Sequence, residues 1–168
     1  MRKFAILAIL LIFAVIPFAF APSAAATQPV RTSFSFTADP ITVEDICSFP
    51  VTVISTLNGT ETDFFDSSGA VTMVLIHSTE QDTFTANGKS LTGFPYTFEI
   101  QILFDESGNV THVFASGVVE MLTLPDGTLF ISAGRVDFAA HPGSIFVISP
   151  DVGVSGDVDA FCGFFADP

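Results

Sequence analysis

The chain has 168 residues, of which 49% are hydrophobic and 14% charged, with 18 acidic side chains against five basic ones. That composition argues against an intrinsically disordered chain, which is poor in hydrophobic residues and rich in charge. It also argues against nucleic-acid binding, because neutralising phosphates requires clustered Lys and Arg. A chain of this length predicts one domain.

The N-terminus has the pattern of an export signal. Arg2 and Lys3 precede an apolar run from Phe4 to Ile16, and the small residues at 24–26 fit a cleavage site. An uncleaved membrane anchor is the alternative, but a spanning helix needs about 20 apolar residues. We therefore expect residues 1–26 to be a signal peptide and residues 27–168 to be a single secreted, extracellular domain with no membrane contact after cleavage.

Cleavage would leave a strongly acidic protein. Its only cations would be Arg31, Lys89 and Arg135, against all 18 acidic side chains. Such a surface repels anionic lipids and nucleic acids and attracts cations or basic partners. The simplest role of this charge is to keep an apolar-rich secreted protein soluble.

Two cysteines, Cys47 and Cys162, lie near opposite ends of the expected mature chain. An even count in an oxidising compartment predicts a disulfide, and only one pairing is possible. No Cys-x-x-Cys spacing supports a redox or metal pair. We therefore expect a structural Cys47–Cys162 bridge.

The expected domain has the period of two that is typical of β-strands, and no segment shows a sustained helical period. In chain order, the expected strands include residues 32–36, 51–54 and 70–76. The clearest strand is 96–104, where one face carries Tyr96, Phe98, Ile100, Ile102 and Phe104.

Short turns separate these strands. Asn58-Gly59 and Asn87-Gly88 are typical of type I′ hairpins, in which both central residues have positive φ. Pro125-Asp126-Gly127 fits a three-residue turn that ends on a left-handed glycine. Slightly longer hairpin loops are expected at 67–69 and 107–109, and a further turn at 141–143.

About nine strands joined in this way predict an all-β antiparallel meander. A long meander must bury its edges, so we expect a closed or nearly closed β-barrel, with a two-sheet β-sandwich as the alternative. Gly93, Gly117 and Gly134 are positions where long strands can bend or bulge.

The turn at 125–127 fixes a register between its two flanking strands. If Leu124 pairs with Thr128, then Glu120 faces Ser132 and Leu122 faces Phe130. Continued alternation places residues 112 and 114 on that same face. The candidate ligand-facing residues are therefore His112, Phe114, Glu120, Phe130 and Ser132.

An apolar barrel interior with a few convergent polar groups is the usual composition of a small-molecule site. A buried carboxyl beside a histidine is also able to perform acid–base chemistry. The opposite face is apolar as well, however, and a bulge at Gly117 would exchange the faces midway. If that opposite face is the core, Glu120 and His112 lie in solvent.

The sequence contains no nucleophile elbow, zinc-protease motif, phosphate-binding loop, dinucleotide fingerprint or calcium loop. We therefore assign no catalytic residue, no metal ligand and no cofactor.

Several landmarks occur in a distinctive order: Cys47-Ser48-Phe49-Pro50-Val51, Asn87-Gly88-Lys89, residues 124–128, residues 133–138 and Phe161-Cys162. Together they resemble a group of uncharacterised secreted bacterial proteins, mainly from high-GC Gram-positive genomes, over residues 44–163. The resemblance implies export, the Cys47–Cys162 bridge and an all-β fold. It implies no functional role for any residue.

Three functions remain open. The first is a non-enzymatic extracellular module that binds a small apolar ligand or a protein partner of unknown identity. The second is a structural or cell-surface interaction protein, which predicts a large exposed apolar patch. The third is a barrel isomerase or cyclase without a recognisable motif, which requires His112 or Glu120 to point inward.

Overall fold

The computed structural model describes residues 27–142 and 146–166. The expected signal peptide lies outside these ranges, as does Gly143 of the turn expected at 141–143.

Within the described ranges, nine strands form one antiparallel sheet in the order β1-β3-β4-β6-β7-β8-β9. Seven of the nine follow this order, and the other two are short strands that pair beside it, β2 with β3 and β5 with β4. The strands are β1 (Val30–Thr37), β2 (Ile41–Val43), β3 (Val51–Phe65), β4 (Val71–Ala86), β5 (Lys89–Thr92), β6 (Tyr96–Phe104), β7 (Val110–Thr123), β8 (Leu129–Asp137) and β9 (Val152–Val154).

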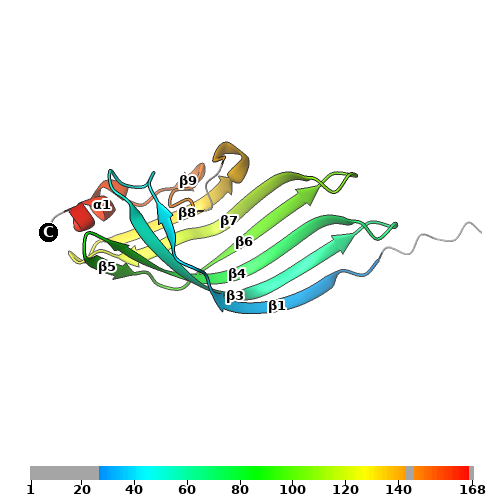
Figure 1. The fold of residues 1–168 in the computed structure, drawn as a ribbon, viewed down its shortest axis with the longest axis horizontal. Helices are drawn as coiled ribbons and strands as arrows, with labels where there is room; N and C mark the ends of the chain where they lie inside the picture. Colours follow the sequence, from blue (N-terminus) through cyan, green and yellow to red (C-terminus); the bar gives the residue numbers. More distant parts are fainter. Residues whose placement is uncertain (1–26, 143–145, 167–168) are drawn as a thin grey trace, which may run out of the picture.

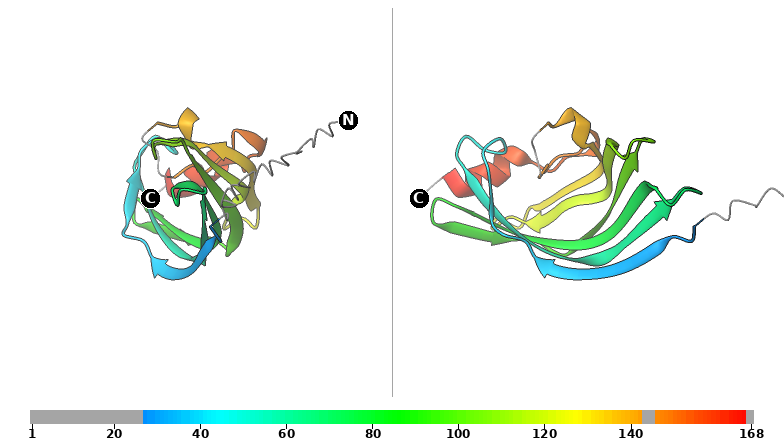
Figure 2. Two further views of the ribbon diagram at one scale, coloured as in Figure 1. Left: turned by 90° about the vertical axis from the view of Figure 1, so that its right-hand side faces the viewer. Right: turned by 45° about the vertical axis from the view of Figure 1, so that its right-hand side comes forward.

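The sheet is strongly curved but not closed (Figures 1 and 2). Strands β1 and β9 form its two edges, and β9 pairs with β8 over only three residues. The all-β class, the antiparallel pairing and the expected number of strands are confirmed. Closure into a barrel is not found, and there is one sheet rather than the two of a sandwich.

A short helix, α1 (Val158–Ala166), follows β9 and was not expected from the sequence. Asp157 begins it: its Oδ1 accepts a hydrogen bond of 2.9 Å from the Ala160 amide, as an N-cap carboxylate does. Phe161 and Phe165, four residues apart on one helix face, are buried. Neither α1 nor the 3₁₀ turn η1 (Phe138–Ala140) could cross a membrane, and no other helix in the described ranges could do so.

Helix α1 covers the concave face at one end of the sheet. Phe161 packs edge-on against Phe84 of β4, with ring centroids 5.1 Å apart, and lies 5.7 Å from Phe130 of β8. The buried core at this end comprises Val43, Val51, Val53, Phe84, Ala86, Leu122, Leu124, Phe130, Ile148, Phe161 and Phe165.

Two further contacts hold α1 in place. The expected disulfide joins Cys162 of α1 to Cys47 in the β2–β3 loop, with the Cα atoms 5.6 Å apart. At the helix C-terminus, Lys89 Nζ donates to the Phe164 carbonyl at 2.6 Å, and Asn87 Nδ2 donates to the Phe165 carbonyl at 3.1 Å. These donors satisfy carbonyls that the helix itself leaves free.

The expected hairpins are largely confirmed. Asn87 and Gly88 have φ of 49° and 77° and join β4 to β5. Leu124 and Thr128 flank the turn at 125–127, where Gly127 has φ of 90°. The loops at 67–69 and 107–109 join β3 to β4 and β6 to β7.

The hairpin expected at Asn58-Gly59 is wrong, because both residues lie inside the continuous strand β3. Gly59 is required in β3 because no side chain larger than hydrogen fits at this position. A Cβ on Gly59 would lie 2.2 Å from the His77 carbonyl oxygen and 2.9 Å from the ring of Phe34. The phenylalanine of the neighbouring strand covers the glycine, so this residue marks a close approach between strands rather than a turn.

Candidate functional site

Three carboxyl groups meet on the concave face of the sheet. Glu80 and Asp82 are two residues apart on β4, so their side chains point to the same face. Glu120 enters from β7 and interacts with both of them. Tyr96 of β6 lies directly opposite Glu80, and Ser55 of β3 lies directly opposite Asp82.

Asp82 is the centre of this group. Its side chain is fully buried, and each of its oxygens accepts a hydrogen bond. The Tyr96 hydroxyl donates to Oδ2 at 2.6 Å, and the Ser55 hydroxyl donates to Oδ1. Both donors are themselves buried. A carboxylate with two charge-assisted hydrogen bonds is held in a fixed orientation.

A bulge in β7 turns Glu120 toward Asp82. Val118 pairs with Ala133 but Glu120 pairs with Ser132, so Val119 is an extra residue in the strand. Glu120 Oε1 accepts a hydrogen bond of 2.9 Å from the Met121 amide. Its Oε2 is buried and has no hydrogen-bond partner among the described residues.

The chain approaches Glu120 closely at Gly93, in the segment between β5 and β6. A Cβ at this position would lie 2.8 Å from Glu120 Oε1 and 2.9 Å from the Met121 carbonyl oxygen. Gly93 also donates its amide to the Asp82 carbonyl at 2.8 Å. The bend expected at Gly93 therefore closes the chain over the carboxyl group.

Burial keeps the carboxyl groups of Glu80 and Glu120 from ionising at their usual pH. Desolvation, followed by the charge of Asp82, raises the pKa of Glu120 to about 10 and that of Glu80 to about 7. Burial, with the nearby acidic charges, also raises the pKa of Tyr96. At neutral pH Glu120 is therefore protonated, and it carries no charge beside Asp82.

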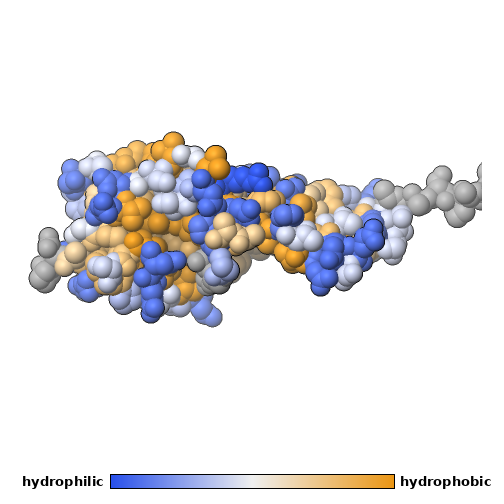
Figure 3. Space-filling view, turned by 90° about the horizontal axis from the view of Figure 1, so that it is seen from above, coloured by the Kyte–Doolittle hydropathy of each residue, from blue (hydrophilic) through white to orange (hydrophobic). Residues whose placement is uncertain are grey.

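A pocket of about 190 Å³ has Glu80 among its lining residues. Its walls come from β3, β4, β6, β7, β8, η1 and the segment before β9. The polar lining groups are Glu80, Tyr96 and Ser116, and the remaining walls are Leu57, Phe98, Ile100, Ala115, Val119, Val136, Phe138, Phe146 and Val147. Apolar side chains also reach the surface among polar ones in Figure 3.

The size and lining suit a small apolar aromatic molecule. A dry apolar cavity of roughly 150 Å³ is sufficient to hold benzene. A few polar groups at the edge of such a pocket fix the orientation of its ligand. Glu80 and Tyr96 occupy that position here.

The structure places the five candidate residues predicted from the sequence on two different faces of the sheet. Glu120, Phe130 and Ser132 are buried on the concave face, and Glu120 faces Ser132 as expected. Phe130 packs in the core against Phe161, and Ser132 Oγ accepts a hydrogen bond of 3.0 Å from the Gly156 amide. None of the three is part of the pocket lining.

His112 and Phe114 lie on the opposite, convex face, so their expected placement with Glu120 is wrong. The bulge at Val119 shifts the alternation by one residue, two positions after Gly117, where a bulge was considered. His112 stacks on Phe114 with ring centroids 5.4 Å apart, and the Arg135 guanidinium lies 3.9 Å from the Phe114 ring centroid.

Sequence reasoning missed Glu80 and Asp82. Both share the strand phase of Phe84 and Ala86, which are buried on the concave face. Two acidic residues in phase with a buried phenylalanine would have pointed to buried carboxyl groups. By contrast, the alternation in residues 96–104 correctly placed Tyr96 on the same face as Phe98 and Ile100.

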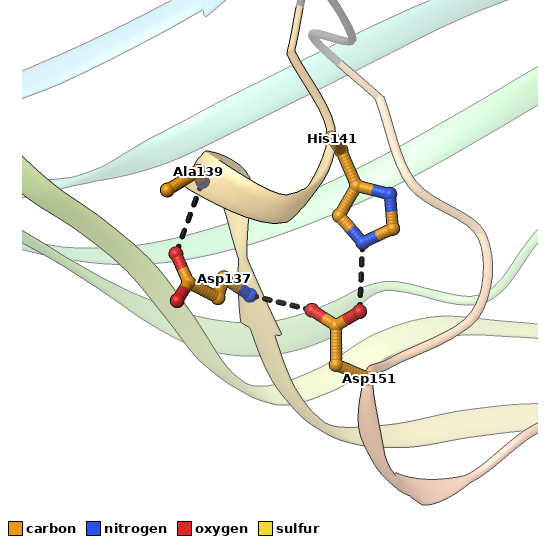
Figure 4. A network of polar contacts seen from close by, with 4 residues as sticks. All are labelled: Asp137, Ala139, His141 and Asp151. Atoms are coloured by element: carbon orange, nitrogen blue, oxygen red, sulfur yellow. Dashed lines mark hydrogen bonds and ion pairs between the residues drawn. The ribbon is translucent and has the colours of Figure 1, made fainter.

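His141, expected as a turn residue, joins a separate polar network near η1 (Figure 4). Its Nε2 lies 2.8 Å from Asp151 Oδ1, and the Asp137 amide donates to Asp151 Oδ2 at 2.7 Å. The Asp137 amide, and then His141, lower the pKa of Asp151. This network connects the segment before β9 to the end of β8. Across the described ranges, no group of three or more His, Cys, Asp or Glu is arranged to hold a metal ion.

No protein family, curated protein or solved structure matches the chain. The geometry therefore carries the functional argument: an apolar pocket of about 190 Å³, with an ionisable carboxyl group and a tyrosine in its lining.

Proposed function

We propose that this protein is an exported, non-enzymatic binding module that holds a small apolar ligand in the pocket beside Glu80. The observation that carries the proposal is the pocket of about 190 Å³, whose lining is apolar except for three residues. Apolar walls supply affinity by burying ligand surface, and the few polar groups supply orientation. The Cys47–Cys162 disulfide supports export, because such bonds persist in oxidising compartments.

The proposal is tested by titration with 2-naphthylmethanol, a neutral apolar ring compound. The chain contains no Trp and one Tyr, so naphthyl fluorescence can be excited without interference from tryptophan. Saturable binding to the wild type is expected. Val119→Phe should abolish it by filling the pocket, whereas Val118→Phe, one residue away and outside the lining, should not.

Both valines are half-buried, so the two variants are closely matched. Leu57→Phe, on the opposite wall, provides a second filling variant if Val119→Phe does not fold. Absence of saturable binding to the wild type, or equal binding by the two valine variants, would contradict the proposal.

A second candidate function is proton transfer, and one observation favours it. Glu80 lines the pocket, and burial raises its pKa to about 7, which suits a general base near neutral pH. Its carboxylate would remove an α-proton from an apolar ketone, leaving an enolate, and return a solvent-derived proton to the same carbon. Deuterium exchange into 2-acetonaphthone in D2O, followed by NMR, tests this function: exchange no faster than in buffer, or equal in Glu80→Gln, rejects it.

A further inference from the structure

The pocket has a distinctive distribution of charge. Glu80 is the only charged residue among those that line it, and four aromatic rings share the same walls: Tyr96, Phe98, Phe138 and Phe146. A carboxylate and the faces of aromatic rings both attract positive charge. None of the described residues that line the pocket is a cation, so the lining has no positive charge to attract an anion.

The cations of the domain lie elsewhere. Lys89 is bound to the C-terminus of α1, and Arg135 lies over Phe114 on the convex face. Arg31 Nη2 donates to Thr60 Oγ1 at 3.1 Å, on the outer side of β1 and β3. No protein cation in the described ranges therefore neutralises the pocket carboxylate.

The rest of the concave face adds negative charge. Glu61 and Asp63 of β3 lie opposite Ile76 and Val74 of β4, which share the face of Glu80. The whole chain carries a formal charge of −13. A field of that sign draws cations toward a concave surface and repels anions.

We propose that the ligand of this pocket is a hydrophobic cation: an apolar amine whose protonated nitrogen contacts the Glu80 carboxylate while its ring packs against Phe98 and Phe146. The inference rests on the proposed function and specifies its ligand class. Charge complementarity, the aromatic walls and the absence of a competing protein cation all point to it.

The protonation of Glu80 sets the pH range of this binding. The titratable groups that face Glu80 are Asp82 on its own strand, Tyr96 from β6 and Glu120 from β7. Burial and Asp82 raise the pKa of Glu80 to about 7, so its carboxylate is present above that pH. Affinity for an amine that stays protonated to about pH 9 should therefore rise as pH increases through 7.

The test compares three compounds with one ring system and different charge: 2-naphthylmethylamine, 2-naphthylmethanol and 2-naphthoate. At about pH 8 the amine should bind the wild type about tenfold more tightly than the alcohol, because a hydrogen bond between charged groups is stronger than one from a neutral hydroxyl. The carboxylate should bind most weakly. In Glu80→Gln the ratio of amine to alcohol affinity should fall to near one, whereas Glu106→Gln, which removes an equal charge from an exposed turn, should keep it.

The outcomes separate the two proposals. Binding of the alcohol with equal or weaker binding of the amine would overturn the cationic ligand and leave the apolar pocket in place. Failure of all three compounds to bind would overturn both. If Glu80→Gln does not fold, the wild type alone decides: a preference for the amine that persists unchanged at about pH 5.5, where Glu80 is protonated, would overturn the cationic ligand.

Discussion

The hydroxyl of Tyr96 donates a hydrogen bond of 2.6 Å to Oδ2 of Asp82, and both side chains are buried. The bond joins β6 to β4 on the concave face, and Tyr96 also lines the pocket. Asp82 Oδ1 is held in the same way by Ser55 of β3. A buried charged group is stable only when its hydrogen-bonding capacity is filled, so these two hydroxyls stabilise the whole carboxyl cluster.

Tyr96→Phe should destabilise the protein by about 1–3 kcal/mol, because one oxygen of a buried carboxylate loses its donor without a change in ring packing. Equilibrium unfolding in urea measures the loss. Ser90→Ala, which removes an exposed hydroxyl from β5, should change the free energy of unfolding by less than about 0.5 kcal/mol. Equal effects of the two substitutions would show that the Tyr96–Asp82 bond does not support the cluster.

Stability should fall as pH rises above the ordinary glutamate range. A group whose pKa is raised on folding binds its proton more tightly in the folded state, so its contribution is complete below its unfolded pKa and lost as pH rises through its folded pKa. For Glu80 that loss runs from its ordinary pKa of 4.5 to about 7, and for Glu120 it runs from 4.5 to about 10. The exposed turn carboxylates Asp66, Asp105 and Asp126 have lowered pKa values, so their contribution is lost in the opposite direction, as pH falls below 3.8.

Glu120→Gln should flatten this alkaline decline. The amide stays neutral at every pH and still offers a donor toward Asp82, so the variant should unfold at a higher urea concentration than the wild type at about pH 9. Glu106→Gln removes the same charge from the surface and should retain the slope of the wild type. A wild type whose stability is constant between about pH 5 and pH 9 would contradict the burial of protonated Glu120.

Breaking the disulfide should loosen α1. The bridge closes a separation of 115 residues, and removing a disulfide from a small secreted domain costs about 2–5 kcal/mol. Unfolding of Cys47→Ala/Cys162→Ala, compared with the oxidised wild type, measures that cost, and hydrogen exchange shows whether the amides of α1 lose protection first. Unchanged stability and unchanged protection of α1 would show that Phe161 and Phe165 hold the helix without the bridge.

Two glycines should respond in opposite directions to a single added methyl group. Gly59→Ala places a Cβ 2.2 Å from the His77 carbonyl oxygen, so we expect a loss of about 3 kcal/mol or more. Gly163 lies inside α1, and an added Cβ would meet no atom within 4 Å apart from its chain neighbours and the backbone of the helix itself, so Gly163→Ala should stabilise by about 0.5–1 kcal/mol. Thermal unfolding of the two variants is the measurement, and a Gly59→Ala variant as stable as the wild type would contradict the close approach of β3 and β4.

Local turn chemistry made the sheet largely predictable from the sequence. Pro125-Asp126-Gly127 fixed the β7–β8 register, and the pairing of Glu120 with Ser132 follows from it. Asn58-Gly59 gave a wrong prediction of a hairpin, because a glycine is also required inside a strand where a neighbouring backbone approaches closely. Sequence alternation alone does not separate the two uses.

The placement of His112 and Phe114, the carboxyl site and helix α1 depended on tertiary structure that the sequence pattern does not reveal. An extra residue at Val119 moved His112 and Phe114 to the convex face, and a bulge has no distinctive residue pattern. The site itself joins Glu80 on β4 to Tyr96 on β6 and Glu120 on β7, so it required the register of three strands at once. Helix α1 was missed because it is short, although Asp157 followed by Phe161 and Phe165 has the pattern of a capped helix.

The most direct test of the binding pocket is native mass spectrometry of the full-length protein, expressed with its N-terminal segment and purified from its own culture supernatant. We expect excess mass that disappears on denaturation, from a small compound with a basic nitrogen, in the wild type and in Val118→Phe but not in Val119→Phe. A native mass equal to that of the bare oxidised chain, or excess mass that Val119→Phe retains, would contradict a ligand held beside Glu80.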